Sequence, residues 1–549
     1  MKKTKGKTIV GIGFALSLMF ACNAFLAACG PGTVEYDPNN FLTEEMAEAE
    51  YGNKYRIVRD PVTISICVPK HSLHSNYKDM KVFQVLSRIT NLKFDFNEID
   101  YEAYSDKKPL MWEDASALPD CFMFCNSLEE QVLYSSLGAI APLDDLIDQY
   151  CPNYKALMGE YKEIAQTSTL TDGHIYSFCS VDRQGSTCYQ YVNNQWLTDL
   201  YNDGVIDFTM PSTVEEYKEM LTAFKNNDPN HNGKADEIPL CTKFNYTSIY
   251  LLSAFGHVTK SAEITDDGDF IFVPQTEEYK EYVKYAKSLY DEKLINQNLY
   301  EITDGDVANY GAQGIVGTSE NVAAYLLVGD ELAKDYVTIP PLTSDYSPTD
   351  ESGNKKTYHI CFSSFDPTEL IITSKSVYKR EIARLTDILY SDFGVSLFLA
   401  GEEGVDWEYD DDTRTTWHTT YPDNVDNETY RGSITPNVGL GAFFYKSEEW
   451  TSGQTNELVK QLNQDRSVYE SSYKEALPPL VFTSEESEEL AYVKLELDSY
   501  VATTEADFIT GKKNVDSYWN TFQSTIKKIG VEKLLKIYRD AYARSVSRG

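Results

Sequence analysis

The chain has 549 residues, with 49 lysines and arginines against 85 aspartates and glutamates, and its formal net charge is −36. So acidic a chain is unsuited to nucleic acid, because binding a polyanion requires clustered cations that release counterions. The same charge disfavours a wholly anionic ligand such as a polyuronate, although a local basic patch would still admit one. Its length allows two or three domains with sizeable cores.

The N-terminus has the layout of a bacterial export signal. Four lysines within the first seven residues precede an apolar stretch over about residues 9–21. The sequence LAACG at residues 26–30 then places small residues before a cysteine, as in a lipobox. We therefore predict a signal peptide over residues 1–28 and a lipid on Cys29. This lipid would anchor the mature protein to the cell membrane, facing the extracellular side.

Two alternatives to this anchor are an uncleaved membrane helix and a soluble secreted protein. Cys22 is a poorer lipidation site, because the bulky Phe20 stands where a lipobox has a small residue. Residues 29–57 are acidic and poor in core residues, which predicts a flexible tether. No later segment approaches the roughly 20 apolar residues needed to span a bilayer.

Eight cysteines follow the lipobox, and none falls in a paired CxxC metal pattern. Several lie inside apolar runs, where cysteine behaves as a small buried hydrophobe. Disulfides are possible outside the cell, and Cys179 with Cys188 is the most favoured local pair.

From residue 62 onward, strand and helix patterns alternate. Residues 62–68 form a β-branched run, residues 80–89 have a helical period, and residues 92–96 and 121–124 have strand patterns. This alternation is typical of βαβ units on a parallel sheet.

A second α/β region opens near residues 188–191. Its clearest helix is predicted to begin at a capping box of Ser212 and Glu215. The buried face of this helix is predicted to contain Val214, Tyr217, Leu221 and Phe224. Further helices are expected over residues 277–290 and 378–390, and a polar loop reaching residue 356 suggests a crossing between domains. The C-terminal part is predicted to be helical, with a core stripe at Trp519, Phe522, Ile526 and Ile529.

Residues 228–237, DPNHNGKADE, match an EF-hand calcium loop through its ninth position. The matching oxygen ligands are the side chains of Asp228, Asn230, Asn232 and Asp236 and the main-chain carbonyl of Lys234. The twelfth position is Pro239, where an EF-hand has glutamate, so the loop is not a full EF-hand. We predict one structural Ca²⁺ here, and the alternative is a solvated turn rich in asparagine and aspartate.

A series of short sequences, in this order, resembles extracellular solute-binding protein family 1. They are LPD at 118–120, GAIAPLDDLIDQYCPNY at 138–154, DGHIY at 172–176, WL at 196–197, residues 211–240, DEKLI at 291–295, YSDFG at 390–394 and GEEGV at 401–405. Within that family, the chain is similar to ABC transporter lipoproteins related to the calcium-carrying alginate-binding proteins. The resemblance covers nearly all of the mature chain.

The resemblance implies an α/β fold with two discontinuous lobes, as in periplasmic binding proteins, a hinge and a helical C-terminal part. By that analogy the first lobe comprises residues 58–184 and 357–400, and the second comprises residues 185–356 and 401–549. Hinge closure on a ligand is the expected mechanism. The resemblance also implies that Glu237 is a further Ca²⁺ ligand, and that the protein is a monomer working with membrane permease subunits and an ATPase.

Sugar recognition requires aromatic faces and planar polar groups. In the family that the chain resembles, ligand contacts come from loops that follow strands. This nominates Asn126, Ser127, Asn245, Tyr246, Thr318, Ser319, Phe365, Trp407 and Trp417. We expect Trp407 or Trp417 to stack on the ligand, because both lie in a polar stretch with no core stripe beside it. Trp196 and Trp519 are expected in the core.

Catalytic patterns are few: the chain has no HExxH and no GxSxG sequence. Glu402, Glu403 and Asp406 are acids of the kind that pair in a glycosidase, so a calcium-stabilised surface polysaccharide hydrolase or lyase is the alternative function. A surface adhesin is disfavoured because repeats and a Thr/Pro-rich stalk are missing. The sequence favours a lipid-anchored, non-enzymatic solute-binding protein that captures an oligosaccharide and delivers it to an ABC transporter.

Overall fold

The computed structural model describes residues 36–114, 117–183, 187–244, 246–265, 267–361, 364–422, 425, 427–440, 444–477, 480 and 482–548. The predicted signal peptide and Cys29 lie outside these residues. The chain divides into two units, residues 1–39 and residues 40–549. The elements described below belong to the second unit. Within the described ranges, no helix is both long and apolar enough to cross a membrane.

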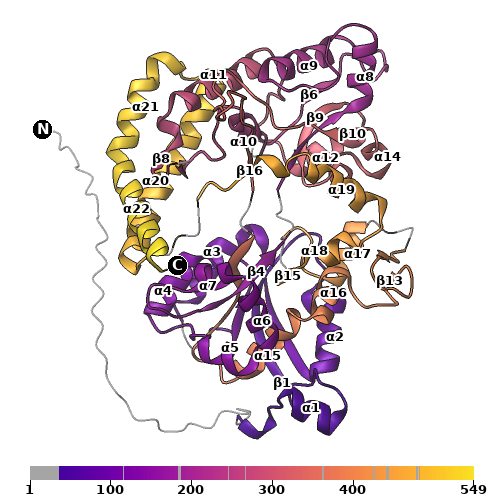
Figure 1. Ribbon diagram of the computed structural model, residues 1–549, viewed down its shortest axis with the longest axis vertical. Coiled ribbons are helices and arrows are strands. Elements are labelled where there is room, and N and C mark those ends of the chain that lie inside the picture. The colour runs from indigo at the N-terminus through magenta and orange to yellow at the C-terminus, as the bar shows by residue number, and fades with distance from the viewer. Residues whose placement is uncertain are drawn as a thin grey trace, which may run out of the picture. The chain divides into compact units, whose positions relative to one another are not determined.

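The first sheet has six strands in the order β15-β4-β12-β3-β1-β2 (Figure 1). Strands β2 and β3 run parallel to β1, whereas β12 runs antiparallel to both β3 and β4. The strands are β1 (Val62–Lys70), β2 (Leu92–Asp100), β3 (Cys121–Met123), β4 (Ser177–Asp182), β12 (Phe365–Ile372) and β15 (Tyr445–Lys446). The βαβ units predicted from residue 62 onward are therefore confirmed.

Helices pack on this sheet through their apolar faces. Val82 and Leu86 of α2 share one core with Ile64 and Val68 of β1. Burying each such side chain stabilises the fold by about 1.5–3 kcal/mol. The helices of this region are α2 (Lys81–Thr90), α3 (Tyr101–Met111), α4 (Leu128–Ser136), α5 (Asp144–Tyr150), α6 (Pro152–Glu160), α7 (Lys162–Ser168), α15 (Lys379–Leu389) and α16 (Asp392–Ala400).

The second sheet has the order β10-β5-β9-β6. Strands β6 and β9 are parallel, and β5 is antiparallel to β9 and β10. The strands are β5 (Tyr189–Asn193), β6 (Ile238–Leu240), β9 (Val316–Asn321) and β10 (Tyr336–Thr338). The helices are α8 (Asn194–Asn202), α9 (Val214–Asn226), α10 (Tyr246–Ser253), α11 (Glu277–Asp291), α12 (Asp304–Ala312), α13 (Ala324–Val328) and α14 (Asp330–Ala333).

Helix α9 begins one residue later than its predicted capping box. Thr213 caps the helix and Glu216 completes the box, whereas the sequence suggested Ser212 and Glu215. The Ser212 hydroxyl still donates to the Glu216 carboxylate, while the Thr213 hydroxyl accepts from the Glu216 amide. The predicted buried face of α9 is confirmed.

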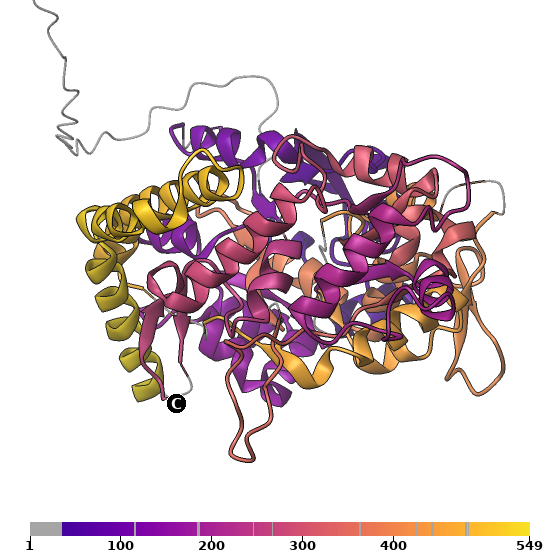
Figure 2. The ribbon, with the colours of Figure 1, turned by 90° about the horizontal axis from the view of Figure 1, so that it is seen from above.

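Three helices close the chain, as predicted, and pack into the core of the second sheet. They are α20 (Ser484–Ile509), α21 (Val515–Ile529) and α22 (Val531–Arg548). Trp519, Phe522 and Ile526 are buried in that core, and Gly530 ends α21 with a positive φ. Figure 2 shows these helices, in yellow, lying together at one side of the chain.

The two sheets have separate main cores and make two lobes. Segments that connect the lobes bond to one another. Strand β11 (His359–Ile360) pairs in parallel with β16 (Tyr473–Lys474), and Thr187 donates to the carbonyl of Ile360. Strands β7 (Ala262–Ile264) and β8 (Phe270–Phe272) form a separate hairpin.

The sequence-based assignment ends the second segment of the first lobe at residue 400, which is too early. Strand β15 pairs with β4 of the first sheet, and Phe444 lies in the first core. Asp406 forms an ion pair with Lys81 of α2. Asp406, Phe444 and β15 therefore contact the first lobe, although we had assigned residues 401–549 to the second. The elements after α16 are β13 (Trp407–Tyr409), β14 (Trp417–Thr419), α17 (Asn427–Ile434), α18 (Glu448–Ser452) and α19 (Glu457–Ser467).

The tether predicted over residues 29–57 is also too long. Helix α1 (Glu44–Tyr51) is ordered, and Leu42 and Ile57 are buried. Arg384 of α15 donates to the carbonyls of Leu42, Lys54 and Arg56. These bonds fix residues 42–57 to the first lobe.

Candidate functional site

Parallel strands place the segments that follow β1, β2 and β3 at one edge of the first sheet. His71 follows β1, Tyr101 follows β2, and Phe124 and Cys125 follow β3. The rings of His71 and Tyr101 lie 6.3 Å apart, and Tyr101 is 43% exposed. Ligands of α/β sheets bind outside the carboxyl ends of the strands. This edge is therefore the candidate contribution of the first lobe to a ligand site.

The turn after β3 is strained. Phe124 and Cys125 have φ values of 68° and 54°, in the left-handed region that costs an L-residue about 1–2 kcal/mol. The Phe124 amide donates to the carbonyl of Glu369 at 2.6 Å, and the Asn126 amide donates to that of Thr368 at 3.1 Å. Such strain persists where surrounding contacts hold it, often at ligand sites.

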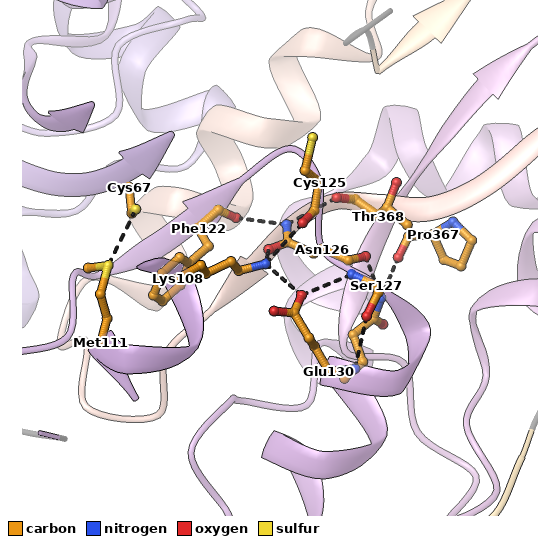
Figure 3. Close-up of polar contacts among 11 residues, drawn as sticks. Cys67, Lys108, Met111, Phe122, Cys125, Asn126, Ser127, Glu130, Pro367 and Thr368 are labelled. Atoms are coloured by element: carbon orange, nitrogen blue, oxygen red, sulfur yellow. Dashed lines mark hydrogen bonds and ion pairs between the residues drawn. The ribbon is translucent and has the colours of Figure 1, made fainter. Parts of the chain in front are cut away.

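The ammonium group of Lys108, on α3, donates hydrogen bonds to this turn (Figure 3). Its side chain is 2% exposed, and its Nζ donates to the Cys125 carbonyl at 3.0 Å and to Asn126 Oδ1 at 2.8 Å. A third bond, of 2.7 Å, joins Nζ to Glu130 Oε2 on α4. Burial lowers the pKa of Lys108, and the charge of Glu130 opposes that shift. One ammonium group thus joins α3, the strained turn and α4.

The second sheet offers a matching edge at the carboxyl ends of β6 and β9. Thr242 follows β6, and its hydroxyl donates to Glu320 Oε1 of β9 at 2.9 Å. Thr247, in the first turn of α10, donates to the other oxygen of Glu320. Burial raises the pKa of Glu320 to about 7, and the two threonine hydroxyls oppose the shift.

Several nominated residues have structural partners. Asn126 is buried and its Nδ2 donates to the carbonyls of Phe122 and Thr368, at 3.2 and 3.0 Å. Ser127 is the N-cap of α4. Thr318 is buried and accepts a 2.7 Å bond from Gln190 Nε2.

Apart from the two tryptophans, the other nominated residues are Asn245, Tyr246, Ser319 and Phe365. Asn245 lies outside the described residues, and the structure describes only the backbone of Tyr246. Ser319 is buried, and its Oγ has no partner among the described residues. Phe365 is half-buried, with its ring 5.8 Å from that of Tyr161. Direct ligand contact by these residues stays a prediction.

The premise for Trp407 and Trp417 is wrong, because a core does lie beside them. The two side chains are 1% and 4% exposed and pack with Trp450 and Ala400. The rings of Trp417 and Trp450 are stacked 4.3 Å apart. Trp407 Nε1 donates to the Gly401 carbonyl. Stacking on a sugar would require this cluster to open.

The acids considered for glycosidase chemistry are paired with cations. Arg88 binds Glu402 at 2.6 Å, Arg414 binds Glu403 at 3.0 Å, and Lys81 binds the buried Asp406 at 2.8 Å. A catalytic acid needs a raised pKa, which an adjacent cation opposes. The arrangement therefore does not favour an acid pair.

In the predicted calcium loop, side-chain oxygens accept hydrogen bonds from groups of the same loop. Asp228 accepts bonds from the amides of Asn232 and Gly233, at 3.2 and 3.0 Å. Asn232 Nδ2 donates to Asp236 at 2.9 Å. Burial raises the pKa of Glu237, helped by the charges of Asp228 and Asp236, and its Oε1 is buried without a partner among the described residues.

This donor set fits a hard cation. It consists of carboxylate, amide and carbonyl oxygens, which Ca²⁺ prefers, and the unpartnered Glu237 oxygen lies beside them. No group of three His, Cys, Asp or Glu side chains placed to hold a metal ion occurs in the described part of the chain. The carboxylates of Asp228, Asp236 and Glu237 are therefore not gathered as a metal-binding group, and a bound cation would also need the two asparagines and the main-chain carbonyl.

Among the described residues, the free thiols include Cys67, Cys121, Cys125, Cys151, Cys179, Cys188 and Cys241. The suggested pair of Cys179 and Cys188 is not formed. Cys179 is buried and its Sγ donates to the Ser180 carbonyl instead.

Sequence reasoning did not nominate the site residues His71, Tyr101, Lys108, Cys125, Thr242 and Glu320. Tyr101 follows a strand that the pattern predicted, so the rule about loops after strands would have found it. Glu320 follows two nominated residues directly. Nothing in the sequence marks Lys108, because its partners come from a different loop and helix.

Comparison with known proteins finds relatives that cover half of the chain or more. No family model matches. The fructooligosaccharide ABC transporter substrate-binding protein FusA of Streptococcus pneumoniae serotype 4 is 24% identical over 566 residues, covering 96% of each chain. The chain is thus similar over nearly its whole length to an ABC transporter substrate-binding protein. Lipoprotein LipO of Bacillus subtilis is 22% identical over 289 residues, which cover 50% of this chain and 55% of LipO.

Solved structures show the same two-lobe fold. FusA in complex with kestose has a TM-score of 0.75 and 22% identity, covering 89% of this chain and 100% of FusA. Alginate-binding protein AlgQ2, solved without calcium ion, has a TM-score of 0.72 and 20% identity with the same coverage. The predicted fold class and the family resemblance are confirmed.

Proposed function

We propose that the chain is the extracellular substrate-binding protein of an ABC transporter for an oligosaccharide. The observation that supports this most is the full-length relation to FusA, a fructooligosaccharide-binding protein, over 96% of both chains. The same fold in the kestose complex of FusA agrees with it. The paired acids at residues 402, 403 and 406 do not favour the alternative of a hydrolase or lyase.

In this proposal each lobe contributes one edge to the site. The first lobe contributes His71, Tyr101 and the turn at Cys125, and the second contributes the Thr242 and Glu320 region. A sugar held by both edges favours a closed arrangement of the lobes, because only that arrangement offers both sets of contacts. The bonded segments at β11 and β16 act as the hinge. The monomeric protein then delivers the sugar to the permease subunits.

We also propose one structural Ca²⁺ in the loop at residues 228–237. Asp228, Asn230, Asn232, Asp236 and Glu237, with the Lys234 carbonyl, would hold it, and a bound cation would offset the repulsion among the three carboxylates. A solved structure of FusA is that of an EF-hand mutant in complex with fructo-nystose, which indicates an EF-hand in that protein. In this chain the loop is exposed and joins α9 to β6, which suits a stabilising role.

The lipid anchor at Cys29 is the third part of the proposal. It rests on the lipobox at residues 26–30, and LipO is named a lipoprotein. A diacylglycerol at that cysteine would keep the binding protein at the membrane surface beside its transporter.

A thermal-shift screen of the mature protein against an oligosaccharide panel tests the binding function. At least one oligosaccharide should raise the melting temperature in a saturable way, since a ligand that binds only the native state stabilises it. A panel of mono-, di- and oligosaccharides without any stabilising member would contradict the proposal.

A further inference from the structure

Glu320 is a carboxylate held at the second-lobe edge without a counter-cation among the described residues. Its two bonds come from the neutral hydroxyls of Thr242 and Thr247. Three fully buried acids elsewhere in the chain are each paired with a lysine, whereas Asp387 and Asp465 accept bonds from neutral groups. Lys474 pairs with Glu263, Lys260 with Glu505, and Lys81 with Asp406. A carboxylate that only fixed a loop would gain from such a partner, because an unpaired buried charge is costly.

The carboxylate retains capacity for a ligand. Each carboxylate oxygen accepts about two hydrogen bonds, and the structure supplies one to each oxygen of Glu320. Glu320 is partly exposed, so part of its side chain is accessible at this edge. One acceptor direction on each of two adjacent oxygens suits a pair of neighbouring hydroxyl groups.

The groups that surround Glu320 add no positive charge. They are the thiols of Cys188 and Cys241, the phenol of Tyr217 and the carboxylate of Asp304. Lys243 is nearby in sequence to Thr242, but its ammonium is paired with Asp304 at 2.9 Å. The local field therefore favours a neutral or cationic partner over an anion.

We propose that Glu320 contacts the ligand directly, accepting hydrogen bonds from two neighbouring hydroxyls of a neutral sugar and excluding sugars that carry a carboxylate. The inference rests on the proposed function and adds the substrate class. A hydrogen bond to an ionised acceptor is stronger than one between neutral groups. A uronic acid would instead place a second negative charge beside Glu320, and such repulsion is an effective means of specificity.

The experiment compares the wild-type protein with Glu320→Gln, which keeps the shape and removes the charge. Asp304→Asn is the matched control, because Asp304 is exposed and carries the same charge nearby. The probes are kestose, maltotriose, xylotriose and trigalacturonate, titrated by calorimetry. We expect the best neutral trisaccharide to bind E320Q about 10- to 100-fold more weakly at pH 8. We expect D304N to bind it within about twofold of wild type, since screened surface charges contribute little.

The pH profile separates ligand contact from a structural role. With the pKa of Glu320 raised to about 7 by burial, wild-type affinity should fall about tenfold from pH 8 to pH 6, as protonation removes an acceptor. E320Q should show no such change. Because the pKa of Glu320 is higher in the folded protein, the folded state binds the proton more tightly than the unfolded state. The free energy of unfolding without ligand should therefore fall as the pH rises from about 4.3, the unfolded pKa, to about 7. A purely structural Glu320 would show this change in stability alone.

Two results would overturn the inference. The first is an E320Q variant whose affinity and pH profile match those of the wild type. The second is a wild-type protein that binds trigalacturonate as tightly as the neutral sugars. If the wild type binds no saccharide in a wider panel, the proposed function itself fails and the inference fails with it. Melting curves of both variants show that each is folded at the titration temperature.

Discussion

Replacing Lys108 by methionine tests whether the ammonium group holds the turn after β3. The substitution keeps an unbranched apolar side chain but removes three hydrogen bonds and the ammonium that lies near the rings of Tyr104 and Phe122. It leaves Glu130 without its cation, while Phe124 and Cys125 keep their strained φ values. The variant should therefore lose free energy of unfolding in the first lobe.

The size of that loss follows from burial. Breaking a buried ion pair by removing one partner costs about 3–5 kcal/mol. The Glu130 side chain is 22% exposed and keeps its bond from the Ser127 amide, so water can compensate part of the charge. We therefore expect a loss of about 3 kcal/mol, measured by urea unfolding followed by circular dichroism and fluorescence.

A matched control is Lys155→Met, since the Lys155 and Asp148 side chains are 57% and 69% exposed. That variant should lose less than about 0.5 kcal/mol, as exposed pairs do. The double variant Lys108→Met with Glu130→Met should be less destabilised than the two single losses added, because no charge is then left unpaired. A Lys108→Met protein as stable as Lys155→Met would refute the reasoning.

Three further predictions concern the tryptophan cluster, the calcium loop and the anchor. Trp407→Ala should lower the free energy of unfolding by about 3–5 kcal/mol, because it empties a buried site; lost sugar affinity with unchanged urea unfolding would contradict this. Calcium added to chelated protein should stabilise it by about 2.7 kcal/mol at 100-fold over the dissociation constant, and Asp236→Asn should weaken that response in melting scans; identical melting with and without calcium would contradict the site. Cys29→Ala should leave the protein unprocessed or released from membranes, and a lipidated Cys29→Ala protein would show that another cysteine is used.

Local periodicity predicted the elements of the fold well. Helix α9 and strand β1 carry their apolar residues at spacings that a single segment reveals, so their existence and buried faces could be read directly. Their ends were less certain: Ser212, Thr213, Glu215 and Glu216 offer two overlapping capping boxes, and only the fold selects one.

The site depends on contacts between distant positions, which no local pattern encodes. Thr242 and Glu320 are 78 residues apart, and Asn126 and Thr368 are 242 apart. The tether was overestimated for the same reason, since Arg384 fixes Leu42 from 342 residues away. These pairings depend on the order of strands in each sheet.

The tryptophan cluster shows a different limit. Trp407 and Trp417 lie on strands of three residues each, too short to display a period of two. Their core is completed by Trp450, which comes from a separate helix. Without that third residue the stretch looks like an exposed loop, and aromatic side chains in a loop suggest a ligand. Burial is the property that distinguishes the two interpretations.

The central claim, that this chain captures a sugar without altering it, is tested most directly by one titration. Purified mature protein is titrated calorimetrically with the oligosaccharide that gives the largest thermal shift, and the sugar is then recovered and analysed by mass. The account predicts saturable binding and recovery of the intact sugar. Shortened or unsaturated products, or the absence of binding by any oligosaccharide of the panel, would contradict it.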